Sequence, residues 1–449
     1  MTMDAYPEDW TTYSIGQIGD PLMCKRILKE QTEESGDVPF YKIGTFGRKA
    51  DAYISRGLYE DFKSKYSYPK KGDILISAAG TIGRLVVFDG EDAYFQDSNI
   101  VWLGNDETIV LNLYLYWAFQ NMKWQSEDGG IVSRLYNNNF KAMQLVVPPL
   151  PEQRRIAAAL GDMDKLIDNL SKRIEKKKAI KQGAMQELLT GKKRLPGFEG
   201  CDDEGVVATQ DAECVTTAPT PSGSAVGCDD EGVVATQGTE CVTTAPTPSE
   251  YGGWKKVRLG DCGRWLGGGT PSTHVREYWE GNVPWISSSD ITEGDIYTIT
   301  KTRFVSNVAI RDSKTTICPE GTIHIVARVG VGKIAIATEP TCTSQDYANL
   351  LPCGIDTQFA AYLISRMMIS KKEDVQGTSI KGLSLEDLKR IVLFVPHSLP
   401  EQRAIAKVLG DMDAEIAKLE AKREKLTGIK KGMMSDLLTG KVRLKGGTE

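Results

Sequence analysis

The chain has 449 residues, with 55 Lys and Arg against 60 Asp and Glu, and a net charge of −5. A chain of this length can bury two cores, no apolar run approaches the roughly 20 residues of a membrane span, and no signal peptide is visible at Met1. We therefore expect a cytoplasmic multidomain protein.

The charge is uneven along the chain. Residues 196–250 carry eleven acidic residues and no Lys or Arg, and without them the net charge is +6. Residues 1–149 nevertheless hold 15 basic against 20 acidic residues. Binding of a nucleic acid would therefore depend on local patches or on partner subunits.

Residues 1–149 are expected to form a folded domain. GDILISAAGTIGR at 72–84 predicts an apolar strand and a tight turn that ends in Arg84, and LVVF predicts the next strand. Glycines let backbone N–H groups approach phosphates, and Arg can contact a phosphate or a base edge, so the turn is a candidate DNA contact. A plain hairpin, whose glycines only satisfy the turn geometry, is the alternative interpretation.

Residues 150–195 predict one long helix. Pro151 suits its first turn, Glu152 suits the positive end of the helix dipole, and Gly191 suits its end. At 1.5 Å per residue, roughly 40 residues give a rod of about 60 Å. Apolar residues at steps of four and three form one seam near the 3.5-residue period of a coiled coil, and these are Ile156, Leu160, Met163, Ile167, Leu170 and Ile174.

Residues 196–250 read as a disordered acidic linker. CDDEGVVATQDAECVTTAPTPS at 201–222 returns at 228–249 as CDDEGVVATQGTECVTTAPTPS, a 27-residue unit without Lys, Arg or an aromatic residue. Such a composition cannot bury enough apolar surface to offset chain entropy.

Residues 251–398 are expected to form a second domain that duplicates the first. GTIHIVARVGVGK at 321–333 lies 249 residues after GDILISAAGTIGR, and Gln345 and Asp346 stand at the same offset from Gln96 and Asp97. Its turn ends in Lys333.

Residues 399–444 repeat residues 150–195, with 27 of 46 aligned positions identical. Similar seams in one chain are natural partners, so we expect the two helices to pack antiparallel around an approximate internal two-fold; an ordinary amphipathic core helix is the alternative. Arg423 stands where the first copy has Ile174, and residues 445–449 form a tail. The second seam consists of Ile405, Leu409, Met412, Ile416, Leu419 and Leu426. The expected fold class is mixed α and β: two globular domains separated by two long antiparallel coiled-coil helices.

Motifs for catalysis or metal binding are missing, so no catalytic or metal residues are assigned. The sequence has no GxxxxGK[ST] phosphate loop, no Asn-Pro-Pro-Tyr-like motif and no CxxC or Cys/His cluster. His324 is expected to have a structural role. Four cysteines belong to the linker repeat, and the other five are expected to be buried free thiols: Cys24, Cys262, Cys318, Cys342 and Cys353.

Three motifs occur in both helix copies: Leu-Pro-Glu-Gln-Arg at the start, Gly-Asp-Met-Asp within, and Leu-Leu-Thr-Gly-Lys near the end. Together they resemble the conserved regions of specificity subunits of type I restriction–modification systems. The Gly-Thr-Pro-Ser and Pro-Trp-Ile pieces between 267 and 291 are similar to segments common in this family. The linker repeat departs from it, because there the helix usually leads directly into the next domain.

The resemblance implies a non-catalytic DNA-recognition subunit. Residues 1–149 and 251–398 would be target recognition domains, each reading one half of a split double-stranded DNA site. The helices would set the spacing and carry the modification (methyltransferase) subunits. Its partners would be two modification subunits, which use S-adenosylmethionine, and restriction subunits, which use ATP and Mg.

Candidate DNA contacts follow from side-chain chemistry together with the resemblance, since Gln and Asn can address adenine and Arg or Lys guanine. Each could equally hold a phosphate or a turn. In the first domain they are Ser77, Thr81, Arg84, Gln96, Ser98, Asn99, Arg134 and Asn137, and in the second Thr270, Ser288, Arg328, Lys333, Gln345 and Lys381.

Three other functions compete with this one. A self-sufficient DNA enzyme would need the motifs that are missing. A pure coiled-coil scaffold would not explain two dissimilar folded halves. A lone DNA-binding regulator is the stronger rival, and capture of a methyltransferase subunit would discriminate it.

Overall fold

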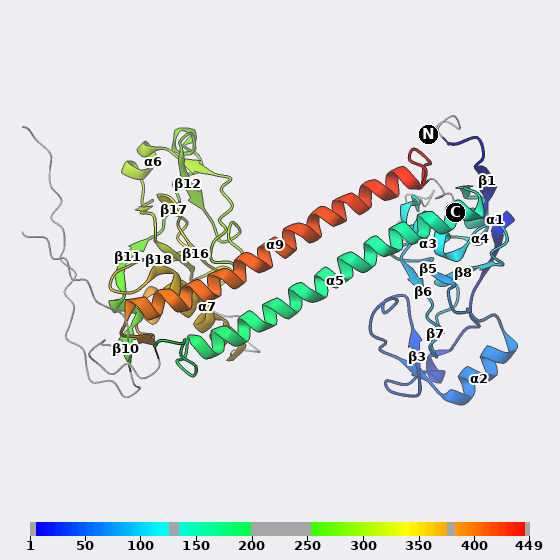
Figure 1. Ribbon diagram of the computed structural model, residues 1–449, viewed down its shortest axis with the longest axis horizontal. Coiled ribbons are helices and arrows are strands. Elements are labelled where there is room, and N and C mark those ends of the chain that lie inside the picture. Colours follow the sequence, from blue (N-terminus) through cyan, green and yellow to red (C-terminus); the bar gives the residue numbers. More distant parts are fainter. Residues whose placement is uncertain (1–5, 125–133, 199–252, 375–381, 445–449) are drawn as a thin grey trace, which may run out of the picture. The chain divides into compact units, whose positions relative to one another are not determined.

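The computed structural model describes residues 6–124, 134–198, 253–374 and 382–444. The linker repeat and the candidate DNA contact Lys381 lie outside these residues. The chain divides into two compact units, Met1–Ile174 with Lys418–Glu449, and Glu175–Ala417. Each unit therefore holds one mixed domain together with part of both long helices (Figure 1).

The first unit is built on a four-stranded antiparallel sheet of order β2-β8-β5-β6 and a three-stranded sheet of order β4-β3-β7, in which β3 and β7 are parallel. A ribbon of β1 and β9 brings the start of this domain beside its end. The strands are β1 Thr11–Ser14, β2 Gly19–Leu22, β3 Val38–Tyr41, β4 Tyr53–Ile54, β5 Ile74–Ser77, β6 Leu85–Val87, β7 Tyr94–Phe95, β8 Ile100–Asn105 and β9 Gln144–Val147; the short helices are α1 Ile15–Ile18, α2 Arg56–Lys65, α3 Asn112–Asn121 and α4 Asn137–Ala142.

The second unit repeats this plan. Its sheets have the orders β11-β18-β15-β16 and β13-β12-β17-β14, β12 and β17 are parallel, and the ribbon is β10 with β19. The strands are β10 Trp254–Arg258, β11 Gly263–Gly267, β12 Val283–Ile286, β13 Phe304–Val305, β14 Ile317–Cys318, β15 Ile323–Val326, β16 Ile334–Ile336, β17 Thr341–Thr343, β18 Tyr347–Pro352 and β19 Val392–Pro396; the helices are α6 Asn307–Asp312, α7 Thr357–Asp374 and α8 Leu385–Lys389.

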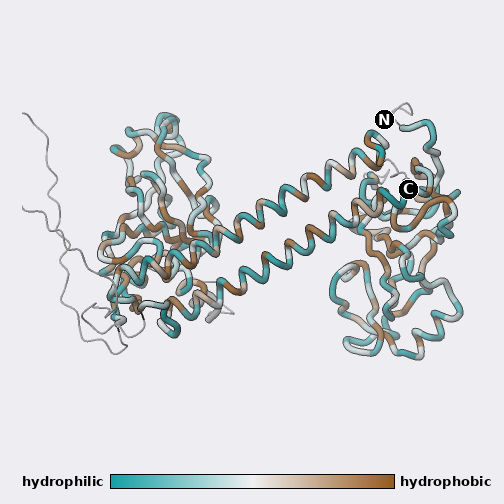
Figure 2. The backbone as a smooth tube through the Cα atoms, in the orientation of Figure 1, coloured by the Kyte–Doolittle hydropathy of each residue, from teal (hydrophilic) through white to brown (hydrophobic). Residues whose placement is uncertain are grey.

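The two long helices are α5 Leu150–Leu188 and α9 Leu399–Leu437, each of 39 residues. They end close to the expected glycines, because Gly191 and Gly440 adopt φ of 70° and 69°, a conformation that favours glycine and turns the chain out of the helix. Figure 2 shows hydrophobic residues recurring at intervals along both helices. All twelve residues of the two predicted seams are buried or half-buried.

Each mixed domain has its own core. In the first unit one apolar cluster joins α3 and the β2-β8-β5-β6 sheet to Ile156 and Leu160 of α5 and Leu437 of α9. In the second unit the matching cluster joins α7 and the β11-β18-β15-β16 sheet to Leu188, Ile405 and Leu409. The same parts of the helix repeat therefore complete the core of both domains.

One expectation about the cysteines is wrong in part. Cys24, Cys262, Cys318 and Cys342 are buried free thiols, whereas Cys353 is exposed, because it follows directly on the end of β18. His324 lies fully buried in β15, and its Nδ1 lies 2.7 Å from Oδ1 of Asn349 on the neighbouring strand. Within the described residues, no helix is both long and apolar enough to cross a membrane.

Candidate functional site

The ends of the long helices are joined by two equivalent ion pairs. Arg443 donates to both carboxylate oxygens of Glu152 at 2.7 and 2.6 Å, and Arg194 donates to both oxygens of Glu401 at 3.0 and 2.7 Å. The glutamates are 3% and 1% exposed. In each unit, therefore, the segment that leaves one helix is fixed to the first turn of the other.

These pairs give the repeated Leu-Pro-Glu-Gln-Arg motif a structural meaning. The glutamine of the motif accepts from a backbone N–H at the start of the next helix of its domain. Leu111 N, before α3, donates to the Gln153 side chain, and Asp356 N, before α7, donates to the Gln402 side chain, both at 2.8 Å. Glu152 also accepts from Trp10 Nε1 at 3.2 Å. The motif thus fixes each mixed domain to the start of its helix, a role that local sequence periodicity does not reveal.

A second duplicated contact lies within the helices. Lys430 of α9 pairs with Asp164 of α5 at 2.5 Å and stands 4.8 Å above the Trp117 ring of α3. In the second unit Lys181 pairs with Asp413, also at 2.5 Å, and stands 5.3 Å above the ring of Tyr362 of α7.

The tyrosine of the second unit also makes a hydrogen bond to the aspartate of this pair. Tyr362 donates to Asp413 at 2.6 Å, and burial together with this carboxylate raises the pKa of the phenol. The second Asp of each Gly-Asp-Met-Asp motif is thereby assigned to joining the helices and the domain.

The sense of the helix pairing follows from these contacts. Along the part of the helices in the second unit, Lys177 pairs with Glu415 and Lys181 with Asp413, so residue numbers rise on one helix as they fall on the other. The helices are antiparallel. A shift of 249 residues converts each of the duplicated ion pairs of one unit into that of the other, as expected for an internal two-fold repeat.

Most candidate DNA contacts of the first domain gather at one place. The β5–β6 turn, the turn before β8 and the segment before α4 meet there, since Ala78 N donates to Asn99 O and Leu135 N donates to Ala78 O, both at 2.8 Å. Arg134 donates to Ser98 O at 3.0 Å. The candidates in these segments or next to them are Ser77, Thr81, Arg84, Ser98, Asn99, Arg134 and Asn137. Of these, Thr81 and Asn137 are exposed.

The second domain repeats the meeting of three segments. Ala327 N donates to Asp346 O at 2.8 Å, and Leu383 N donates to Ala327 O at 2.7 Å. Arg328 is exposed on the β15–β16 turn beside these bonds. Thr270, also exposed, donates to Gln345 across the same end of the sheet.

Several candidates have structural partners. Arg84 donates to Phe46 O at 3.0 Å, and Lys333 donates to Ser288 O at 2.8 Å, so each basic residue holds a loop of its own domain. The Gln96 side chain accepts from Ile43 N at 2.9 Å, and the Ser77 hydroxyl donates to Thr81 O at 2.6 Å. These bonds favour the plain-hairpin interpretation for the backbone of the turns, and they leave Thr81, Asn137, Arg328, Thr270 and Gln345 as the exposed members.

Sequence reasoning missed a cavity of about 630 Å³ in the second domain. Trp279 and Trp285 line it with ring centroids 5.1 Å apart, and the Arg303 guanidinium lies 4.6 Å from the Trp285 ring. Trp285 N donates to Arg303 O, and in the first domain Phe40 N donates to Ala52 O. Phe40 and Ala52 therefore occupy the positions of Trp285 and Arg303 in the first domain, and both are buried. The two tryptophans in the segment 267–291 were the available signal; Arg303 had none.

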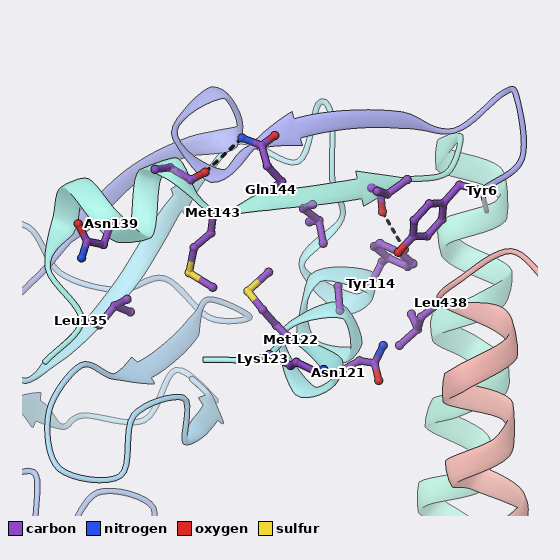
Figure 3. Close-up of a pocket in the computed structure, with 14 residues that line it drawn as sticks. Tyr6, Tyr114, Asn121, Met122, Lys123, Leu135, Asn139, Met143, Gln144 and Leu438 are labelled. Carbon is purple, nitrogen blue, oxygen red and sulfur yellow. Dashed lines mark hydrogen bonds between the residues drawn. The ribbon is translucent and has the colours of Figure 1, made fainter. Parts of the chain in front are cut away.

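A cavity of about 610 Å³ lies in the first unit (Figure 3). Its lining is mixed: Met122, Met143 and Leu135 contribute apolar surface, and Gln144 and Lys123 contribute polar groups. None of the candidate DNA contacts lines it. Within the described residues, no group of three or more His, Cys, Asp or Glu could hold a metal ion.

Comparison with known sequences gives matches along both halves. The model of the type I restriction modification DNA specificity domain matches residues 7–181 and again 251–427. A putative type I restriction enzyme specificity subunit, S.HindORF215P of Haemophilus influenzae, is 59% identical over 157 residues, which are 35% of this chain and 41% of the relative. The putative type I restriction enzyme MjaX specificity subunit of Methanocaldococcus jannaschii is 24% identical over 457 residues, which cover 98% of this chain and 95% of the relative. The chain thus spans less than half the length of the Haemophilus relative but nearly all of the MjaX subunit.

Solved structures with the same fold include the S subunit of a type I restriction–modification system from M. genitalium. It has a TM-score of 0.56 at 16% identity, with 97% of this chain and 98% of that chain covered. A structure that describes complex assembly and conformational transition of the type I R-M system has a TM-score of 0.53 at 14% identity, with 97% and 99% covered.

Proposed function

Because the chain belongs to the type I restriction modification DNA specificity family, we propose that its two mixed domains are target recognition domains, each of which reads one half of a split DNA site. The family is the DNA-recognition component of such systems and is not catalytic. The chain is accordingly a DNA specificity subunit. No catalytic residue is assigned to it.

One observation supports the proposal that the two domains recognise DNA separately: the same backbone hydrogen bonds occur in both domains, but the side chains around them differ. The three-segment meeting point is held by matching bonds in both domains, at Ala78 and at Ala327. Around it the side chains differ, with Arg134 beside the first turn and the Thr270–Gln345 pair beside the second. Base edges are distinguished by side-chain donors and acceptors, so two such surfaces would read two different sequences.

The long helices are proposed to set the distance between the half-sites. A helix of 39 residues has a length of about 58 Å at 1.5 Å per residue, and the helix-end ion pairs prevent one helix from sliding along the other. A fixed helix length would then correspond to a fixed number of base pairs.

The chemistry is assigned to partners. Two modification subunits would bring S-adenosylmethionine and methylate adenine, and restriction subunits would bring ATP-driven translocation and cleavage with Mg. Support comes from the family and from the absence of the corresponding motifs in the sequence.

Exchange of one recognition domain tests the proposal. Residues 1–149 would be replaced by the first domain of another family member, and the methylated motif would be determined by methylation-sensitive sequencing of the host genome. One half of the motif should change while the other half and the spacer stay the same. Changes in both halves would refute separate reading, and failure of the chain to capture a methyltransferase subunit would favour a lone DNA-binding regulator.

A further inference from the structure

The β15–β16 turn of the second domain presents three exposed residues in a row, Arg328, Val329 and Gly330. Val329 is 69% exposed, although turn positions are mostly occupied by Gly, Pro, Asn, Asp and Ser. A single exposed apolar side chain is ordinary on a protein surface. The geometry of the turn and the neighbours of Val329 therefore decide whether this side chain has a role.

The tip of the turn is arranged to hold this valine. At the offset of 249 residues, Val329 corresponds to Gly80 of the first domain, which has φ of 65°. In the second domain the residue with positive φ is Gly330, one position later, with φ of 83°. A β-branched residue is strongly disfavoured at positive φ, so the shifted glycine is what allows a valine at this place. The second turn thus displays an apolar side chain where the first displays none.

The rest of the turn is the same in both domains. Gly83 N donates to Ser77 O at 3.0 Å, and Gly332 N donates to Val326 O at 3.4 Å. The strands on either side are antiparallel neighbours in both cases, β5 with β6 and β15 with β16. The two turns therefore differ in the side chains at their tips and not in the strands that hold them.

Arg328 stands directly before the valine. Within the part of the chain that the structure describes, its guanidinium makes no hydrogen bond or ion pair. Lys333, at the end of the same turn, donates to Ser288 O at 2.8 Å and is thereby held by its own domain. Gly330 has no side chain. The exposed tip of the turn consequently offers donors from Arg328 and methyl groups from Val329, and it offers no side-chain acceptor.

This combination fits two of the four base edges in the major groove. Guanine presents two acceptors, O6 and N7, and thymine presents the O4 acceptor beside its C5-methyl group. The exocyclic amino groups of adenine and cytosine are donors and call for an acceptor, which the tip lacks. Arginine is the usual partner of guanine, and an apolar side chain is the usual partner of the thymine methyl group.

We propose that the β15–β16 turn selects a guanine through Arg328 and a neighbouring thymine through Val329, and that Val329 is the residue that specifies the thymine. The methyl groups of the valine pack against the C5-methyl group of the base and exclude water from both. Gly80, without a side chain, cannot make this contact in the first domain. The assignment rests on the proposed function, since it requires the turn to face the major groove.

The complex of the full chain with its modification subunits would be tested on duplexes that carry the motif found by methylation-sensitive sequencing. Each thymine of the second half-site, on either strand, is replaced in turn by uracil, which lacks only the C5-methyl group. Fluorescence anisotropy measures binding to the wild type and to Val329→Ala. Val392→Ala is the matched control, because Val392 is 51% exposed on β19 of the same unit and lies outside the turn.

At one thymine, uracil should weaken binding to the wild type and to Val392→Ala about fourfold, the effect of one buried methyl group. The same uracil should leave binding to Val329→Ala unchanged, because the partner of the methyl group is already missing. Equal effects of uracil on the wild type and on Val329→Ala at every position would overturn the role of Val329, as would a second half-site without an A·T pair. Either result would leave separate recognition of the two half-sites intact.

Arg328→Ala tests the other half of the contact. In the same complex it should relax the requirement for one G·C pair next to this thymine, and an unchanged motif would overturn the role of Arg328. A wild-type complex that binds all sequences equally would overturn both this assignment and the proposed function.

Discussion

We predict that removal of the arginine from a helix-end ion pair destabilises the second unit more than the first. Removal of one partner from a buried ion pair costs about 3 to 5 kcal/mol, because the remaining charge stays buried without compensation. In Arg194→Ala, Glu401 loses the only side-chain donor that the structure describes for it. In Arg443→Ala, Glu152 still accepts from Trp10 Nε1, and a hydrogen bond to a charged group contributes about 1.5 to 3 kcal/mol.

We therefore expect Arg194→Ala to lower the free energy of unfolding by about 4 kcal/mol, and Arg443→Ala to lower it by less. Arg443→Ala also removes the ion pair of Arg443 with Asp9, but this pair is exposed to solvent and narrows the difference between the two variants only slightly. Urea unfolding followed by circular dichroism measures both. Arg403→Ala is the control, because the Arg403 side chain is 69% exposed and its Nε lies 3.9 Å from the Asp356 carboxylate; this variant should lower the free energy of unfolding by less than about 1 kcal/mol. A larger loss in Arg443→Ala than in Arg194→Ala would refute the reasoning.

Three further predictions concern titration, DNA contact and spacing. Burial lowers the pKa of His324 to about 4, whereas histidine in the unfolded chain has a pKa of about 6.5. As the pH falls from 6.5 to 4, the unfolded chain therefore binds a proton that the folded chain does not, and the free energy of unfolding decreases by about 3 kcal/mol. The unfolding midpoint, measured between pH 8 and pH 4, should show this loss. The variant His324→Leu carries the residue that the first domain has at the equivalent position, Leu75, and its midpoint should depend less on pH; an equal pH dependence in both proteins would contradict the prediction. Arg84→Ala should weaken DNA binding by about 1 to 3 kcal/mol and relax one motif position if the guanidinium reaches a base, whereas unchanged affinity and motif would leave it only the role of holding Phe46. Insertion of four residues after Leu170 adds about 6 Å and should alter the methylated spacer or abolish activity, while deletion of residues 201–227 should leave the motif and spacer unchanged; a spacer shifted by the deletion would make the linker part of the ruler.

The sequence alone determined the elements whose signal is local. Apolar spacing located the two long helices, the repeat of 27 identical positions in 46 gave the duplication, and the strand–turn–strand patterns at 72–84 and 321–333 located equivalent hairpins. Periodicity reports which face of an element is apolar, and it does so without reference to distant residues. The helix ends at Gly191 and Gly440 also follow from a local signal, since glycine favours the positive φ that ends a helix.

Only the tertiary structure shows which distant residues these elements bring into contact. Arg194 and Glu401 are 207 residues apart in the chain, and Arg443 and Glu152 are 291 apart, so no local pattern pairs them. The backbone oxygens that accept from Arg84 and Lys333, Phe46 O and Ser288 O, likewise come from distant parts of the chain. The role of a charged or polar side chain depends on the partners that folding brings near it, whereas the role of an apolar side chain follows from the face of the element on which it lies. The sequence alone could therefore predict the apolar faces, but the ion pairs and hydrogen bonds required the fold.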